Sequence, residues 1–186
     1  LLKVLRPSKD RAEPPCPCAR ACGGCQLQAL SYEKQLEFKE KKVRGNLERI
    51  GGFSDFVIEK VIGMEEPWRY RNKAQYPVGK DKDGKIITGF YAGRTHSIIP
   101  NRDCLLGAEV NEEILNRVLA YMEENHTEPY DESTGKGLVR HILIRYGFKT
   151  GEIMVCLIIN GRKLPGAEKL TAALREIPGM TGISLN

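Results

Sequence analysis

The fold is decided by the stretch LVRHILIRYGFKTGEIMVCLIIN, residues 138–160. Two runs rich in Val, Ile and Leu flank the segment 147–151, whose glycines favour a reversal of the chain. Residues 153–160 are apolar at both odd and even positions, which is typical of a strand buried on both faces. The stretch therefore predicts a β-hairpin whose second arm lies inside a sheet.

Further strands and helices are predicted on either side of this hairpin. Strand patterns occupy residues 56–62, 68–78, 86–92 and 181–186, and Asp83-Gly84 in the polar segment 80–85 favours a second hairpin turn. Helical periodicity marks residues 31–50, 111–124 and 167–177. Hairpins separated by helices indicate an α+β fold with a mostly antiparallel sheet.

Composition and charge narrow the class of protein. The 186 residues are 41% apolar and 28% charged, as in ordinary globular proteins. We expect a cytoplasmic protein without a membrane partner, because no apolar run approaches the roughly 20 residues that cross a bilayer. Residues 67–105 hold eight basic and three acidic side chains, whereas residues 109–132 hold eight acidic and one strongly basic. The basic segment fits either a polyanion-binding surface or a solvated hairpin.

Six cysteines form the strongest chemical signal. Cys16, Cys22 and Cys25 have the spacing C-x5-C-x2-C, and Cys104 follows a predicted strand. Three close thiolates and one distant thiolate favour an iron–sulfur cluster, with zinc and a redox C-x-x-C pair as the alternatives. Cys18 is an alternative first ligand, and Cys156 is expected to be a small buried side chain.

These cysteines belong to a longer pattern that resembles the RumA-type 23S ribosomal-RNA (uracil-5-)-methyltransferases. The resemblance is carried by the cysteine string through CGGCQLQ (residues 22–28) and by several shorter motifs, namely PSKDR (7–11), LSY (30–32), YRNKAQ (70–75), GFY (89–91), Asp103-Cys104, Arg140-His141 and TGI (181–183). The match spans nearly the whole chain, and the cysteine string is highly specific.

The resemblance implies a domain plan and a cofactor. In this family, a TRAM β-barrel precedes a central domain with a [4Fe–4S] cluster, and a Rossmann-like methyltransferase domain follows. Residues 1–11 would be the end of TRAM, residues 12–30 and 51–186 the central domain, and residues 31–50 a helix packed on the methyltransferase domain. Cys16, Cys22, Cys25 and Cys104 would hold the cluster. The methyltransferase domain, which binds S-adenosylmethionine, would be absent.

The resemblance also implies a reaction. The whole protein would be a monomer that methylates carbon 5 of a uracil in 23S rRNA. Residues 1–186 alone would be inactive, because no strand opens into a glycine-rich loop and no cysteine has a nucleophile-like setting. The alternatives are a tRNA uracil methyltransferase of the same family and a stand-alone iron–sulfur RNA-binding module.

The predicted strand 68–78 suggests how RNA would be held. If it is extended from Trp68 onward, then Arg69, Arg71, Lys73 and Gln75 project from one face. Cations contact phosphates and an amide can contact a base edge or sugar. Phe90 or Tyr91 on the next strand would stack on an unpaired base, unless Phe90 belongs to the core. His96 and His141 are expected to be structural.

Overall fold

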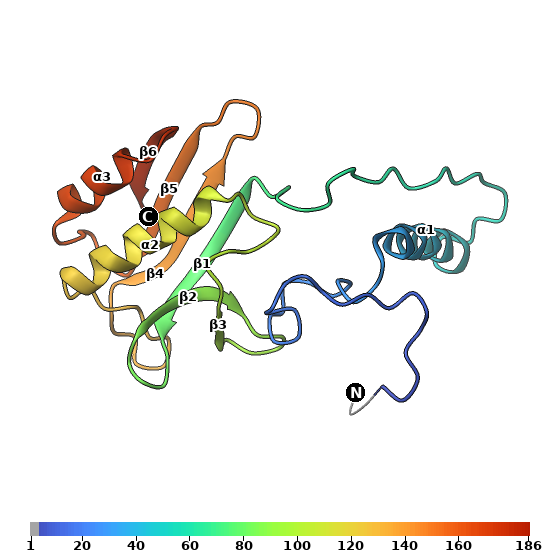
Figure 1. The fold of residues 1–186 in the computed structure, drawn as a ribbon, viewed down its shortest axis with the longest axis horizontal. Helices are drawn as coiled ribbons and strands as arrows, with labels where there is room; N and C mark the ends of the chain where they lie inside the picture. Colours follow the sequence, from blue (N-terminus) through green and yellow to red (C-terminus); the bar gives the residue numbers. More distant parts are fainter. Residues whose placement is uncertain (1–3) are drawn as a thin grey trace. The chain divides into compact units, whose positions relative to one another are not determined.

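The computed structural model describes residues 4–186 (Figure 1), which divide into two compact units. We call residues 4–20 and 25–67 the helical unit, and residues 21–24 and 68–186 the sheet unit. Each is described by itself. Residues 1–3, at the start of the predicted TRAM segment, lie outside the described residues. Arg11, at its end, forms an isolated antiparallel bridge with Leu30 within the helical unit.

The helical unit is built around α1 (Tyr32–Arg49), which confirms the helix predicted at 31–50. Ser31 lies at the N-cap position, and the backbone of Gly52 is left-handed (φ 70°) just beyond the helix end. The Tyr32 hydroxyl accepts a hydrogen bond from the backbone N–H of Met64 (2.8 Å), which fixes the returning chain. No described residue of the helical unit is fully buried, and Phe38, Val43 and Ile50 are exposed.

Residues 56–62 do not form the predicted strand. They run without regular structure, and the side chains of Val57 and Ile62 are 88% and 96% exposed. A strand needs a partner to satisfy its backbone hydrogen bonds, and no described segment pairs with this one. Its β-branched apolar residues were therefore a misleading signal.

The sheet unit contains six strands and two helices in the part of the chain that the structure describes. The strands are β1 (Lys73–Lys80), β2 (Ile86–Tyr91), β3 (Ile98–Pro100), β4 (Val139–Tyr146), β5 (Ile153–Ile159) and β6 (Met180–Leu185), and the helices are α2 (Val110–Glu124) and α3 (Ala167–Arg175). The strand order is β3-β2-β1-β4-β5-β6, and every neighbouring pair is antiparallel except β5 and β6. The α+β fold and the central position of the hairpin 138–160 are confirmed.

One face of this sheet carries the core. The inward side chains of β1, β4 and β5 pack with the apolar stripes of α2 and α3, both of which lie over this face (Figure 1); the fully buried members include Tyr76, Ile142, Val155, Leu157, Ile114, Leu115, Val118 and Leu174. We call the opposite face the open face. Both described helices of the sheet unit are thereby placed on the core side.

The open face is formed by the other alternate positions of the same strands. The register pairs Lys73 with Arg145 and Gln75 with Leu143, and it pairs Arg145 with Met154 on the far side of β4. Lys73, Gln75, Arg145 and Met154 are exposed, whereas Leu143 is half-buried. A mixed polar and apolar surface is therefore presented by the middle of the sheet.

Candidate functional site

A cationic pair lies on the open face at one end of the two central strands, β1 and β4. Lys73 begins β1 and stands directly opposite Arg145 of β4. Gln75, two residues further along β1, projects from the same face because strand side chains alternate. Both cations are exposed, so the pair can meet an anion without prior desolvation. The sequence prediction that Lys73 and Gln75 share an exposed face is thus supported by the strand geometry.

Arg69 and Arg71 lie outside this strand. The predicted strand began at Trp68, but the backbone of Arg69 is left-handed (φ 54°), Arg71 bridges to Gly107, and β1 begins at Lys73. The strand alternation that was expected to align Arg69 and Arg71 with Lys73 is therefore wrong for these two residues. The Arg71 backbone N–H instead donates to the carbonyl of Leu106 (2.9 Å), and its side chain is half-buried.

The Arg69 guanidinium makes hydrogen bonds within the protein. Its Nη1 donates to the carboxylate of Asp103 (2.7 Å) and to the carbonyls of Cys104 (3.0 Å) and Gly107 (3.3 Å). The hydrogen bond to Asp103 raises the pKa of Arg69 above its ordinary value. Arg69 thus braces the turn that presents Cys104.

Phe90 and Tyr91 occupy opposite faces of β2. The Phe90 ring packs against the buried ring of Tyr76, with a centroid distance of 4.8 Å, so Phe90 belongs to the core side. The prediction of Phe90 as a base-stacking residue is therefore corrected. Tyr91 points the other way and stacks on His96, with a centroid distance of 5.0 Å and an interplanar angle of 24°.

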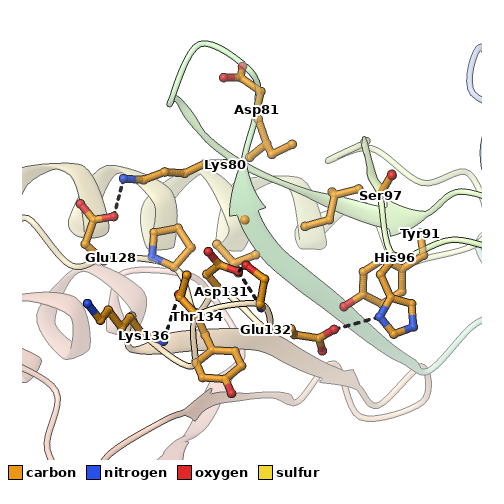
Figure 2. Close-up of a pocket in the computed structure, with 18 of the residues that line it drawn as sticks. Lys80, Asp81, Tyr91, His96, Ser97, Glu128, Asp131, Glu132, Thr134 and Lys136 are labelled. Carbon is orange, nitrogen blue, oxygen red and sulfur yellow. Dashed lines mark hydrogen bonds and ion pairs between the residues drawn. The ribbon is translucent and has the colours of Figure 1, made fainter.

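Tyr91 and His96 line a cavity of about 880 Å³ (Figure 2). It is bounded by β1, β2 and β3 on one side and by the segment 128–137 on the other. Tyr130 and Glu132 from that segment complete the lining near the two stacked rings. The cavity is therefore a separate concave site within the sheet unit.

Charge is concentrated at one wall of this cavity. His96 Nδ1 lies 2.9 Å from Oε2 of Glu132, and Arg140 Nη2 lies 3.9 Å from Oε1 of the same carboxylate. The His96 contact is the main cause that lowers the pKa of Glu132, so the carboxylate is ionised. Burial, and then Glu132, raise the pKa of Tyr91. Burial, and then Arg140, lower the pKa of His141.

Cys22 is held by the edge of the sheet unit. It forms an isolated antiparallel bridge with Ala92, and the next residue, Gly23, donates its N–H to the carbonyl of Tyr91 (2.9 Å). A Cβ on Gly23 would lie 3.1 Å from that carbonyl oxygen, so glycine permits this close approach. The Gly24 N–H lies 3.4 Å from Sγ of Cys22. An amide directed at sulfur is a feature of cluster-binding loops.

The remaining predicted ligands lie on both units. Cys104 is in the sheet unit, and Cys16 and Cys25 are in the helical unit, where the Cys16 carbonyl accepts a hydrogen bond from Ala19 (3.1 Å). All six cysteines, including Cys18 and Cys156, are partly buried. Within residues 4–186 no three His, Cys, Asp or Glu side chains form a group that could hold a metal ion. The four cysteines remain predicted ligands, and thiol is a donor that both iron–sulfur clusters and zinc take.

Sequence reasoning missed several residues of the open face and the cavity. Arg145 lies within the stretch that decides the fold, but its position opposite Lys73 depends on a strand register that no local pattern reveals. Tyr130 and Glu132 were counted only as part of an acidic segment. His96 was expected to be structural, and it does contact Glu132, yet it also lines the cavity.

Comparison with known proteins shows which proteins the chain is similar to. No protein-family model matches the chain. Over its whole length it is 45% identical to an uncharacterized RNA methyltransferase of Clostridium tetani and 44% identical to one of Halalkalibacterium halodurans. The chain spans 40% and 41% of the lengths of these relatives. It is therefore homologous to a part of RNA methyltransferases.

A solved structure gives a more particular likeness. The tRNA (uracil-54, C5)-methyltransferase of Pyrococcus abyssi, in complex with S-adenosyl-L-homocysteine, matches 90% of this chain with a TM-score of 0.69 and 28% sequence identity. The match covers 37% of that protein.

Within the described residues no helix is both long and apolar enough to cross a membrane.

Proposed function

We propose that the chain is part of an S-adenosylmethionine-dependent methyltransferase that acts on carbon 5 of a uracil in RNA, with 23S rRNA as the substrate. Residues 1–186 supply RNA docking and cluster binding, and a further domain binds S-adenosylmethionine and transfers the methyl group. Two findings support this proposal. The relatives are named RNA methyltransferases, and the similar solved structure is a uracil-C5 enzyme in complex with S-adenosyl-L-homocysteine. α1, with its exposed apolar residues, packs on that further domain.

The cross-strand pair of Lys73 and Arg145 carries the docking role. Two cations opposite each other on an exposed sheet face attract a phosphate backbone, and Gln75 beside them can donate to and accept from a base or sugar. The neighbouring apolar surface of Leu143 and Met154 can contact bases that are not paired. An unpaired segment of RNA suits such a surface better than a regular duplex, whose base edges lie in its grooves.

A tRNA substrate is the second candidate. It is favoured by the likeness to the Pyrococcus abyssi enzyme, which acts on a uracil of tRNA. The Lys73–Arg145 surface fits rRNA and tRNA alike, because both substrates offer phosphates and unpaired bases. The choice between them is therefore an experimental outcome.

The cluster would be held by Cys16, Cys22, Cys25 and Cys104, with Cys18 as an alternative to Cys16. The amide of Gly24 directed at Cys22 and the brace of Arg69 on the Cys104 carbonyl support these ligands. Four thiolates suit a [4Fe–4S] cluster, and zinc is the competing metal. When bound, the cluster supplies a structural link, since methyl transfer to a pyrimidine carbon needs no electron transfer.

Methyl transfer tests the proposed function. The full-length protein is incubated with radiolabelled S-adenosylmethionine and unmodified transcripts of 23S rRNA or tRNA. We expect label on 23S rRNA and, once the labelled uridine has been mapped, none on a transcript in which it is replaced by cytidine. Label on tRNA alone would establish the second candidate, and label on neither would contradict the function. Residues 1–186 alone are expected to transfer no label.

A further inference from the structure

The cavity bounded by residues 128–137 is distinct from the Lys73–Arg145 pair. Its floor is apolar: Gly79, Ile87 and Ile98 line it from three neighbouring strands. A Cβ on Gly79 would lie 2.8 Å from Cδ1 of Ile98, so the absent side chain lets Ile98 lie close over β1. A floor of this kind accepts a flat apolar group and offers no hydrogen bond to a phosphate.

An aromatic stack forms one side of the cavity. The stacked rings of Tyr91 and His96 lie together in the lining of the cavity (Figure 2), and Tyr130 lines it from the segment 128–137. The Arg140 guanidinium lies 4.5 Å above the Tyr130 ring and holds that ring in place. Stacking of a base on such a ring contributes roughly 1–3 kcal/mol in nucleic-acid-binding proteins.

The Glu132 carboxylate determines which kind of base the cavity can bind, because it accepts hydrogen bonds and donates none. It lines the cavity, is ionised, and is oriented by His96 on Oε2 and by Arg140 near Oε1. An anion there repels phosphate and accepts N–H donors. Among the four RNA bases, guanine alone presents two adjacent N–H donors, N1–H and N2–H, which match the two oxygens of a carboxylate. Uracil presents one N–H between two carbonyls, which the carboxylate repels.

Three lysines line the cavity together with the carboxylates of Asp81, Glu128, Asp131 and Glu132. Lys82 and Lys136 line its rim, and Lys80 is paired with Glu128. A base that enters brings its own phosphate and that of the next nucleotide, and these would meet the rim lysines. Lys82 and Lys136 are therefore the groups that would meet a phosphate, and Glu132 is the group that would meet a base.

We propose that this cavity holds an unpaired guanine of the RNA substrate, stacked on Tyr91 and hydrogen-bonded through N1–H and N2–H to Glu132. The inference rests on the proposed function, because it assumes that the open face docks RNA. It adds a base-specific contact to the sequence-independent contacts of Lys73 and Arg145. The guanine is a recognition base, separate from the uracil that is methylated.

Fluorescence anisotropy with short labelled RNAs tests this proposal. The full-length protein is titrated with heptanucleotides of uridine that carry G, inosine, A, C or U at the central position. We expect the G oligonucleotide to bind about tenfold more tightly than the U oligonucleotide, which corresponds to one bidentate base contact. Inosine lacks the N2 amino group and should lose a large part of that preference.

Two variants and a control assign the preference. Glu132→Gln should abolish the preference for G, because the amide places N–H donors against the N–H groups of guanine. Tyr91→Ala should weaken binding of every oligonucleotide about tenfold. Glu124→Gln removes an exposed carboxylate of α2 away from the cavity and should change nothing. Unchanged circular dichroism of each variant verifies its fold.

The outcomes separate the two proposals. If G and U oligonucleotides bind equally, or if Glu132→Gln keeps the preference for G, the guanine site is wrong while docking by Lys73 and Arg145 stands. If A or C is preferred instead, a different base occupies the cavity and the guanine assignment is again wrong. If the protein binds none of the RNAs, the docking role itself fails.

Discussion

At the scale of single residues, Tyr76 combines a fully buried ring with a buried polar hydroxyl. Its side chain is fully buried in the core, and its hydroxyl accepts a hydrogen bond from Nδ2 of Asn111 (3.1 Å). Burial raises the pKa of Tyr76 to about 12. Oδ1 of Asn111 has no hydrogen-bond partner among the described residues, so this amide depends on Tyr76 for its one side-chain contact.

We predict that Tyr76 makes the fold sensitive to alkali. The unfolded chain releases the tyrosine proton near pH 10, whereas the native protein retains it up to about pH 12. Because the native state then binds more protons, the free energy of unfolding falls as the pH rises between these values. From pH 8 to pH 11 the wild type should lose about 1 kcal/mol more than Tyr76→Phe.

Urea unfolding of both proteins at pH 8 and pH 11 measures this difference. At pH 8 the variant should already be less stable by about 1 kcal/mol, since the Asn111 amide loses its acceptor. Tyr70→Phe removes an exposed hydroxyl and should follow the wild-type profile. Equal losses in wild type and Tyr76→Phe would contradict the role of the buried hydroxyl.

At the scale of the elements, long periodic segments were predictable and short or unpaired ones were not. α1, α2 and the hairpin of β4 and β5 have the bounds expected from their apolar patterns to within two residues. β3 has only three residues and pairs with β2 alone, so no periodicity marks it. Residues 56–62 have a strand pattern but no partner among the described residues, and the start of β1 depends on the backbone of Arg69.

The pairing of β1 with β4 carries the next prediction. Lys73→Ala combined with Arg145→Ala should weaken binding of single-stranded RNA and reduce the slope of log K against log salt by about 1.4, at roughly 0.7 per phosphate contact. The measurement is anisotropy at several salt concentrations. Arg162→Ala combined with Lys163→Ala makes the same change of charge at exposed positions beyond β5 and is the control. A slope that falls equally in both double variants would exclude a specific role for the open face.

At the scale of the whole molecule, the sequence proposes which cysteines are ligands but does not reveal their surroundings. The string from Cys16 to Cys25 stands out by its spacing, whereas Cys104 is proposed because it follows a predicted strand. Cys22 is bridged to Ala92, and Arg69 donates a hydrogen bond to the Cys104 carbonyl. Both contacts join residues that are far apart in the sequence. The cavity next to Tyr91 likewise needs three strands and a distant segment, which no local motif encodes.

Metal content distinguishes the cysteines of the proposed cluster from the others. After anaerobic purification the wild type should contain iron and sulfide and absorb broadly near about 400 nm. Cys25→Ser should lose both elements and be less stable, because metal binding is linked to folding. Cys156→Ser, which alters a partly buried thiol of β5, should retain them. A colourless protein that contains zinc would contradict the cluster.

The opposite orientations of Phe90 and Tyr91 constrain how β2 can tolerate change during evolution. A single inserted residue upstream in this strand would turn Tyr91 toward the core and Phe90 toward the opposite face, so one slip would damage packing and recognition together. Gly89 opposes such a slip, since a Cβ there would lie 2.0 Å from the carbonyl oxygen of Ile99. Insertions and deletions among homologues should therefore collect in the turn before Ile86 and spare β2 itself.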